Sequence, residues 1–219
     1  MIKNSNLTLV IGDKNLSSWS MRPWLALKAS GLDFTEEKLR LDDPSTKKSI
    51  SRFSPSGRVP VLLHNGLKVW DSLSICEYIA ELAPDKKLWP SNPSHRAIAR
   101  SLVCEMHSGF QALRGQMSMD IQLKMNLKHL TPQTISDVER IVHIWHHSMR
   151  TNGGPFLIGE FGIIDAFFAP VVLRFQSYGI KIKDKDCQKY MDNISNQKFV
   201  KSWVREAKLE KPLEVMFSP

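Results

Sequence analysis

The sequence predicts an α/β domain followed by an all-α helical bundle. Residues 1–83 contain short apolar runs of strand length that alternate with helical patterns. Beyond about residue 95, apolar residues recur every three or four positions and no strand pattern is found. A proline-rich stretch separates the two kinds of pattern. We therefore expect one domain over residues 1–83, a linker over 84–94 and a helical domain over 95–219.

The first domain is expected to begin with a strand, a helix and a second strand. Residues 7–11 form a short apolar run, which is typical of a buried strand. Residues 24–29 follow a helical pattern, and Gly31 ends it because glycine readily adopts the left-handed conformation found after helices. Residues 34–41 form the next predicted strand.

A β-hairpin and a helix complete this domain. Residues 61–64 and 67–70 flank Asn65-Gly66, a pair that favours the positive φ of a tight hairpin turn. Asp71-Ser72 follows and offers side-chain oxygens that cap a helix N-terminus. The order predicts a small mixed sheet with helices packed on it.

Three helices are predicted in the second domain. The first carries apolar residues at positions 98, 102, 106, 110 and 113. The second follows Thr131-Pro132, a cap and a first-turn proline, and extends through Met149. The third extends from Ile163 to about Gln176.

The composition excludes several classes of protein. The chain has 219 residues, of which 42% are hydrophobic and 24% charged, as in ordinary globular proteins. No apolar run approaches the ~20 residues that span a bilayer, and no secretory signal is visible, so we expect no membrane partner and a cytoplasmic location. The three cysteines are far apart, which argues for a reducing compartment and against a disulfide framework or a zinc ribbon.

The net charge of +8 raises the question of a nucleic-acid partner. Residues 1–83 carry 11 basic and 9 acidic side chains, and residues 84–219 carry 19 and 13. Within residues 180–219, lysines alternate with aspartates, as on a solvated surface. No zinc-finger, RNA-recognition or basic-zipper pattern accompanies them, so we expect no nucleic acid.

Ser17, Ser18 and Ser20 precede the first predicted helix. In one interpretation, a serine simply caps the helix N-terminus. In the other, the free N–H groups of this N-terminus stabilise an anion such as a thiolate, whose pKa falls at such a place, and a serine hydroxyl donates a hydrogen bond to the sulfur. The residues alone leave both interpretations open.

Two further motifs also have two interpretations. Pro60 at the start of a strand has no N–H for the ladder. It is either an ordinary strand-entry proline or a cis-proline that turns the Val59 backbone toward an extended ligand. Asp71-Ser72 is either an isolated cap or a place where the ammonium and carboxylate of an amino acid bind together.

The element order, the serines, Val-Pro before the hairpin and Asp-Ser after it together resemble the cytosolic glutathione S-transferase family. The resemblance covers essentially the whole chain and implies a thioredoxin-like N-terminal domain, an all-helical C-terminal domain and a homodimer. It is closest to serine-type, zeta-like (maleylacetoacetate isomerase-like) bacterial members. Their S-S-C-S-W-R pattern is similar to Ser17-Ser18-Trp19-Ser20-Met21-Arg22.

The resemblance implies glutathione as co-substrate and gives roles to individual residues. Ser17, with Ser18 as runner-up, would orient and stabilise the glutathione thiolate. Val59 would pair through its backbone with the cysteinyl part, and Asp71 and Ser72 would hold the γ-glutamyl end. Trp19, Arg58 and Pro60 would complete the glutathione site, and His107, Phe110 and Arg114 would face the second substrate. For that last group, the alternative is helix core with a surface arginine.

Two departures from the family pattern bear on activity and folding. Trp19 stands where the zeta members have cysteine, which argues against zeta isomerase activity and against disulfide exchange at this helix. Gly162 replaces the hydroxyl residue of the S/T-x-x-D capping box of the family, but Asp165 can still accept a hydrogen bond from the Gly162 N–H. We expect Asp165 to act in folding.

No metal is expected. His143, His146 and His147 have helical spacing, but His143 and His147 fall away from the apolar stripe and no H-E-x-x-H pattern is present. We interpret them as part of a solvated face. Cys76 and Cys104 are expected in the helical core.

The expected function is that of a glutathione S-transferase, whose thiolate attacks a small hydrophobic or acidic electrophile. The same site would also suit a glutathione-dependent isomerisation or the reduction of a peroxide. A non-catalytic interaction protein with the transferase fold is the alternative from another class.

Overall fold

The computed structural model describes residues 6–41 and 46–211. In these residues the first part of the chain contains β1 (Leu7–Ile11), α1 (Ser18–Ser30), β2 (Thr35–Lys38), α2 (Thr46–Phe53), β3 (Val61–His64), β4 (Leu67–Val69) and α3 (Ser72–Leu82). The second part contains the 3₁₀ helix η1 (Pro84–Lys86), α4 (Pro93–Ser108), α5 (Gln111–Gln116), α6 (Pro132–Asn152), α7 (Ile163–Ser177), α8 (Lys185–Asn196) and α9 (Lys198–Ala207).

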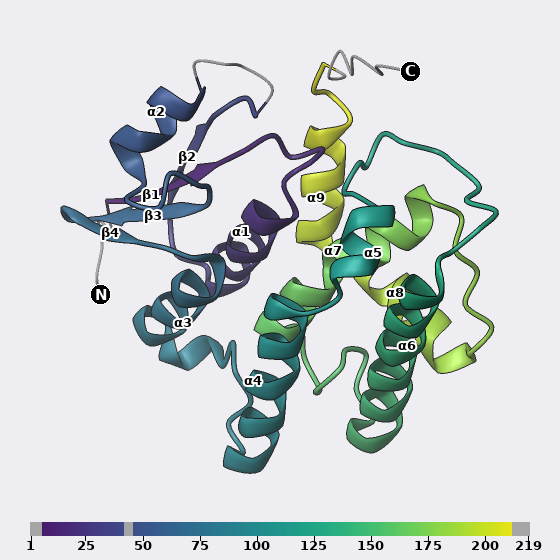
Figure 1. Cartoon of the computed structure of the whole chain (residues 1–219). Helices are drawn as coiled ribbons and strands as arrows, with labels where there is room; N and C mark the ends of the chain where they lie inside the picture. Colours follow the sequence, from purple (N-terminus) through teal and green to yellow (C-terminus); the bar gives the residue numbers. More distant parts are fainter. Residues whose placement is uncertain (1–5, 42–45, 212–219) are drawn as a thin grey trace.

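The four strands form one mixed sheet in the order β2-β1-β3-β4. β1 is parallel to β2 and antiparallel to β3, with Val10 opposite Val61. Helices α1 and α3 lie between the sheet and the helical part, whereas α2 lies away from that boundary (Figure 1). A thioredoxin-like sheet domain followed by a helical domain confirms the predicted fold class.

Local signals in the sequence account for several element boundaries. Gly31 follows α1 in the left-handed conformation, with φ of 70°. Asn65 and Gly66, with φ of 49° and 84°, form the predicted hairpin turn. Thr131 caps α6, and its side chain accepts a hydrogen bond from the Thr134 N–H.

Other elements differ from the prediction. Helix α2 was not predicted, because its eight residues contain only two apolar ones, too few to show a period. The predicted helix through positions 98–113 is interrupted: α4 ends at Ser108, and Phe110 has a left-handed φ of 60° before α5 begins. Helices α8 and α9 were also missed, although each buries an apolar residue every three or four positions.

The core prediction was wrong for two side chains of α4. Ile98 is 58% exposed, so the apolar stripe of this helix extends onto the surface. Cys104 is exposed, whereas Cys76 on α3 is fully buried as predicted. The difference arises because the buried face of α4 consists of Ala99, Val103 and Met106, and Ile98 and Cys104 lie outside that face.

Gly162 and Asp165 begin α7 in the predicted way. Asp165 accepts hydrogen bonds from the N–H groups of Gly162 (3.0 Å) and Leu157 (3.1 Å). A Cβ atom on residue 162 would lie 2.7 Å from the carbonyl oxygen of Leu88. This close approach explains why glycine occupies the cap position here.

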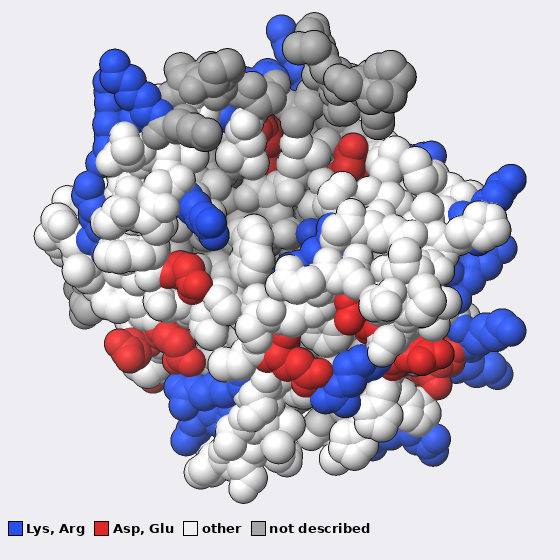
Figure 2. Space-filling view, in the orientation of Figure 1, with Lys and Arg blue, Asp and Glu red and all other residues white. Residues whose placement is uncertain are grey.

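Charged side chains of both signs are interspersed on the face shown in Figure 2, where the surface is hollowed between the two parts of the chain. Within the described ranges, no helix has the length and apolar character needed to cross a bilayer.

Candidate functional site

A cavity of about 380 Å³ opens where the sheet domain meets the helical domain. Seven residues singled out from the sequence line it together, although they come from separate segments of the chain. They are Trp19, Arg58, Val59, Pro60, Asp71, Ser72 and His107, and Ser56 and Trp70 complete the lining.

One wall of the cavity is the segment that leads into β3. The Val59–Pro60 peptide bond is cis, so the ordinary trans strand-entry interpretation was wrong. In the described part of the chain, no residue forms a hydrogen bond with the backbone of Val59. Its N–H and carbonyl groups are therefore available to an extended ligand that adds alongside.

A second wall is the N-terminus of α3. Asp71 caps this helix, because its Oδ1 accepts hydrogen bonds from the N–H groups of Leu73 (2.9 Å) and Ser74 (3.5 Å). The hydroxyl of Ser72 is fully buried and has no hydrogen-bond partner among the residues that the structure describes. Since buried polar groups are rarely left unpaired, this hydroxyl indicates a polar group that binds here.

The third wall comes from the helical domain. His107 at the end of α4 reaches across to the sheet domain, where its Nε2 lies 2.8 Å from Oδ2 of Asp71. Its ring also packs edge-on against Trp19, with ring centroids 5.3 Å apart. Both domains therefore contribute polar groups to one cavity.

Ser17, Ser18 and Ser20, at the start of α1, are buried and do not line the cavity. Ser17 caps the helix: its Oγ accepts a hydrogen bond from the Ser20 N–H (3.3 Å) and donates one to the Ser20 Oγ (2.7 Å). The Ser18 hydroxyl accepts a hydrogen bond from Arg174 (3.2 Å). The capping interpretation thus describes the hydrogen bonds of Ser17.

Phe110 and Arg114 are not among the residues that line the cavity. Phe110 is 7% exposed and belongs to the core, as one alternative predicted. Arg114 is not a surface arginine, because its guanidinium donates hydrogen bonds to the carbonyls of Gly109 (3.0 Å) and Met106 and lies over the Trp19 ring, 4.9 Å from its centroid.

Sequence reasoning missed Arg22 and Arg174, which lie close to this site. Arg22 is one helical turn after Trp19, and its guanidinium stacks 4.2 Å from the centroid of that ring. Arg174 on α7 reaches Ser18 and the Met117 carbonyl. The spacing of Trp19 and Arg22 was visible in the sequence, but Arg174 comes from a helix far along the chain.

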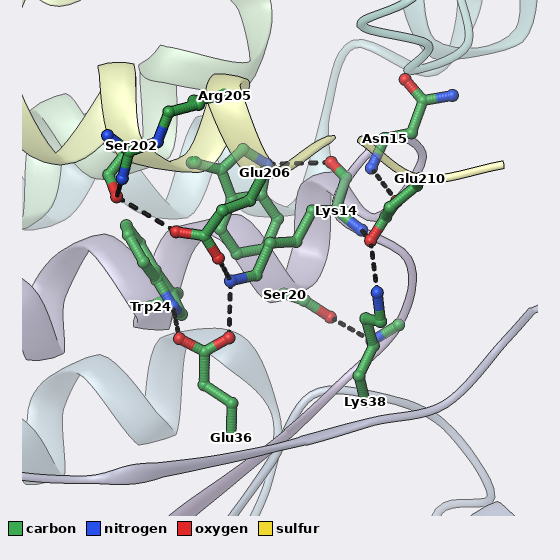
Figure 3. Close-up of polar contacts among 12 residues, drawn as sticks. Lys14, Asn15, Ser20, Trp24, Glu36, Lys38, Ser202, Arg205, Glu206 and Glu210 are labelled. Atoms are coloured by element: carbon green, nitrogen blue, oxygen red, sulfur yellow. Dashed lines mark hydrogen bonds and ion pairs between the residues drawn. The ribbon is translucent and has the colours of Figure 1, made fainter. Parts of the chain in front are cut away.

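The loop before α1 is held by a partly buried ionic network (Figure 3). The Lys14 side chain is 4% exposed, and its ammonium lies between Glu36 of β2 (2.5 Å) and Glu206 of α9. Glu210 accepts hydrogen bonds from the backbone N–H groups of Lys14 (3.0 Å) and Asn15 (2.9 Å). Carboxylates from the C-terminal helix region thus position the segment that leads to Ser17.

A separate group of possible metal ligands lies outside the cavity lining. His146, Asp184 and Asp186 have ligand atoms within 4.8 Å of one another. Asp184 already pairs with His146 (2.7 Å) and caps α8 through the Cys187 N–H (2.8 Å). These contacts account for the group as hydrogen-bonded side chains at a helix N-terminus.

Comparison with known proteins agrees with this geometry. Residues 16–82 match the model of the glutathione S-transferase N-terminal domain. A probable maleylacetoacetate isomerase from Caenorhabditis elegans is 34% identical over 96 residues, which are 44% of each chain, so the match spans less than half of that relative. Maleylacetoacetate isomerase from Rattus norvegicus is 27% identical over 174 residues, covering 75% of this chain and 76% of that one.

Among solved structures, a glutathione transferase homologue from Burkholderia with bound glutathione has a TM-score of 0.71 at 22% identity. The match covers 94% of this chain and 99% of that one. The chain therefore has the glutathione transferase fold, and its residues 16–82 are similar to the N-terminal domain of glutathione S-transferases. Its similarity to maleylacetoacetate isomerases is distant.

Proposed function

We propose that this protein binds glutathione in the cavity between its two domains and transfers the thiolate to a small electrophile. The observation that carries the proposal is the buried, unpartnered Ser72 hydroxyl at the N-terminus of α3, beside Asp71 and the free backbone of Val59. These groups suit a peptide that carries an ammonium and a carboxylate at one end and an amide backbone in its middle.

In this proposal, the glutathione thiol becomes reactive because its sulfur binds near the start of α1. A helix N-terminus carries about half a positive charge, which favours the thiolate over the thiol. Ser17 is the proposed donor to the sulfur, with Ser18 as runner-up; in either case the hydroxyl exchanges its present partner for the ligand. Holding thiolate and electrophile together contributes further to the rate.

Binding of glutathione is the first test, by isothermal titration calorimetry. We expect Ser72→Ala to weaken glutathione binding about tenfold or more, since a hydrogen bond to a charged group contributes ~1.5–3 kcal/mol. Ser74→Ala is the matched control, because Ser74 lies on the same helix but is exposed and outside the cavity. Equal affinity of the two variants, or no binding by the wild type at millimolar glutathione, would refute the proposed function.

The type of reaction is a further part of the proposal. We propose transfer to an electrophile such as an aryl halide, because Trp19 stands in place of a cysteine thiol at the start of α1. Turnover with an aryl halide supports transferase activity. If the protein instead catalyses a glutathione-dependent isomerisation or the reduction of a peroxide, and not the aryl halide reaction, the site belongs to that reaction. Binding without any turnover would indicate an interaction protein.

We also propose that the protein is a homodimer with a cytoplasmic location. Both are usual for proteins with this fold, and sedimentation equilibrium measures the first directly.

A further inference from the structure

A groove with an apolar floor and a cationic rim lies beside helix α9. Two adjoining hollows of about 320 and 150 Å³ form it, and they share Leu173, Gln176, Val204 and Lys208 in their walls. None of the residues that line the groove lines the cavity between the two domains. The groove is therefore a second concave surface, which the proposed function does not use.

The floor of the groove is made of aliphatic side chains. Leu173 of α7 and Val200 of α9 belong to the buried core, and Val204, Ile121 and Leu123 are partly buried against it. Contact with an apolar side chain of a partner would remove the remaining exposed part of this floor from water, which favours binding.

Large apolar side chains are also exposed beside the groove. Met125 is 47% exposed and Leu209 is 81% exposed, and each directly follows a lysine that lines the groove, Lys124 and Lys208. Exposed apolar side chains next to an apolar hollow are typical of surfaces that bind another protein.

The rim of the groove carries four cations. Lys201, Arg205 and Lys208 come from α9 and its C-cap, and Lys124 comes from the segment between α5 and α6. Within the described ranges, no acidic residue lines the groove. The three lysine ammonium groups form no hydrogen bond or ion pair with the residues that the structure describes.

The acids of the same segment do not neutralise this rim. Glu206 pairs with Lys14, and Glu210 pairs with Lys38 and accepts hydrogen bonds from the loop before α1. Arg205 donates only to Ser202, over 3.4 Å. The groove therefore presents an uncompensated positive charge beside an apolar floor, and it is complementary to a partner that is both acidic and apolar.

The spacing of the rim cations favours a helix as that partner. Lys201, Arg205 and Lys208 are spaced i, i+4, i+7, so they lie along one face and span about 10 Å of the helix axis. A fatty acid has one negative charge and would neutralise one cation, and a flat lipid surface would fill neither hollow. A partner helix repeats its carboxylates at the same spacing, and its apolar side chains three or four residues apart can enter the two hollows.

We propose that this groove binds an acidic amphipathic helix of a protein partner. Apolar side chains of that helix occupy the two hollows, and its carboxylates lie over the four rim cations. Opposite charges fix the orientation of the helix and accelerate its association, while apolar contact slows its release. This inference does not depend on glutathione binding.

The test uses a labelled helical peptide of about 20 residues, with leucines at i, i+3 and i+7 and glutamates flanking them. Fluorescence anisotropy measures its binding to the full-length protein. We expect binding that weakens as NaCl rises from about 0.05 to about 0.5 M. Peptides with serine in place of the leucines, or lysine in place of the glutamates, should bind at least tenfold more weakly.

The protein variant Lys201→Glu/Arg205→Glu reverses two rim charges and should bind the acidic peptide at least tenfold more weakly than the wild type. Lys48→Glu/Arg52→Glu is the matched control, because Lys48 and Arg52 are also four residues apart on a helix, α2, and are exposed outside the groove. This control should bind within twofold of the wild type. Lys201→Gln/Arg205→Gln should have an intermediate affinity, and circular dichroism checks that each variant is folded.

Several outcomes would overturn the proposal. They are no binding of the acidic peptide, equal affinity for its serine version, and an equal loss of affinity in the α2 control. Binding of laurate or of phosphatidylserine vesicles in place of the peptide, dependent on Lys201 and Arg205, would assign the groove to a lipid. A changed mass of Lys201→Glu/Arg205→Glu in sedimentation equilibrium would assign it to a second copy of the chain. Peptide binding only after removal of residues 212–219 would assign it to the end of the chain itself.

Glutathione titration of the same variants keeps the two proposals apart. Reversal of the rim charges should leave glutathione affinity within twofold of the wild type, because the rim residues do not line the cavity between the domains. A wild type that binds no glutathione would refute the proposed function and leave the peptide result to decide the groove.

Discussion

The capping of α7 by Asp165 permits a quantitative prediction about stability. This helix is buried along nearly its whole length, so its start must be fixed before the helical domain can pack. The Asp165 carboxylate provides both acceptors, one for the Gly162 N–H and one for the Leu157 N–H. Asp165→Ala removes both acceptors and leaves two N–H groups buried without partners.

The magnitude follows from these two bonds. Each buried donor left without an acceptor costs ~1–3 kcal/mol, so we expect Asp165→Ala to lower the free energy of unfolding by about 2–6 kcal/mol. Asp165→Asn keeps one acceptor oxygen and should lose about half as much. In a protein of this size, ~1 kcal/mol corresponds to a change of ~2–4 °C in Tm.

The stability difference between wild type and Asp165→Asn should also depend on pH. Burial raises the pKa of Asp165 to about 7, although its hydrogen bonds from Gly162 and Leu157 act in the opposite direction. Between the ordinary aspartate pKa of ~3.9 and 7, the folded state therefore holds a proton that the unfolded state has lost. Stability of the wild type should fall with rising pH across this window relative to Asp165→Asn.

Urea unfolding followed by circular dichroism at pH 5, 6, 7 and 8 measures both effects. Asp192→Ala is the control, because Asp192 is an exposed aspartate of α8 and its removal should change stability by less than ~0.5 kcal/mol. An Asp165→Ala protein as stable as this control would refute the capping argument. A pH-independent difference between wild type and Asp165→Asn would refute the argument from burial.

Two further substitutions test the region around α1. Lys14→Met leaves Glu36 and Glu206 without their shared cation and should cost ~3 kcal/mol of stability, measured by urea unfolding. Burial tends to raise the pKa of Glu206, but the hydrogen bond and charge of Lys14 lower it overall. The stabilisation by this ion pair is therefore present above the ordinary glutamate pKa and is lost as the pH falls through the lowered pKa of Glu206. Lys14→Met should therefore be less sensitive to acid than the wild type, and equal sensitivity would contradict this. Ser17→Gly keeps an adequate helix cap, at a cost of a few tenths of a kcal/mol, but removes the hydroxyl. It should raise the pH at which bound glutathione shows thiolate absorbance, whereas an unchanged titration would transfer the role to Ser18.

The sequence by itself determined the fold class and most of the sheet domain. Leu7–Ile11, the Asn65-Gly66 turn and the Asp71 cap depend on neighbours within a few residues, so their signals are readable locally. Helix α2 escaped prediction because its eight residues have too little apolar character to show a period. The break between α4 and α5 escaped because the apolar spacing continues across Gly109 and Phe110.

The sequence singled out residues of the candidate site one by one but not their geometry. Val59 and Asp71 came from local motifs and Trp19 from the family resemblance, and the three line one cavity, whose ligand stays a prediction. Ser17 was expected to face the ligand, yet its hydroxyl is bonded to Ser20, because the turn before α1 brings these two side chains together inside the protein.

Only the tertiary structure decided which charges meet. Lys14 pairs with Glu206, and Arg22 lies near Arg174, across separations of more than 150 residues. Such contacts depend on how α1 packs against α7 and α9, and no local pattern encodes that packing. The sequence therefore determined what kinds of groups border the cavity. The packing of the two domains determined that Lys14 is neutralised by carboxylates, whereas Arg22 stacks on aromatic rings and has two nitrogens with no hydrogen-bond partner in the described residues.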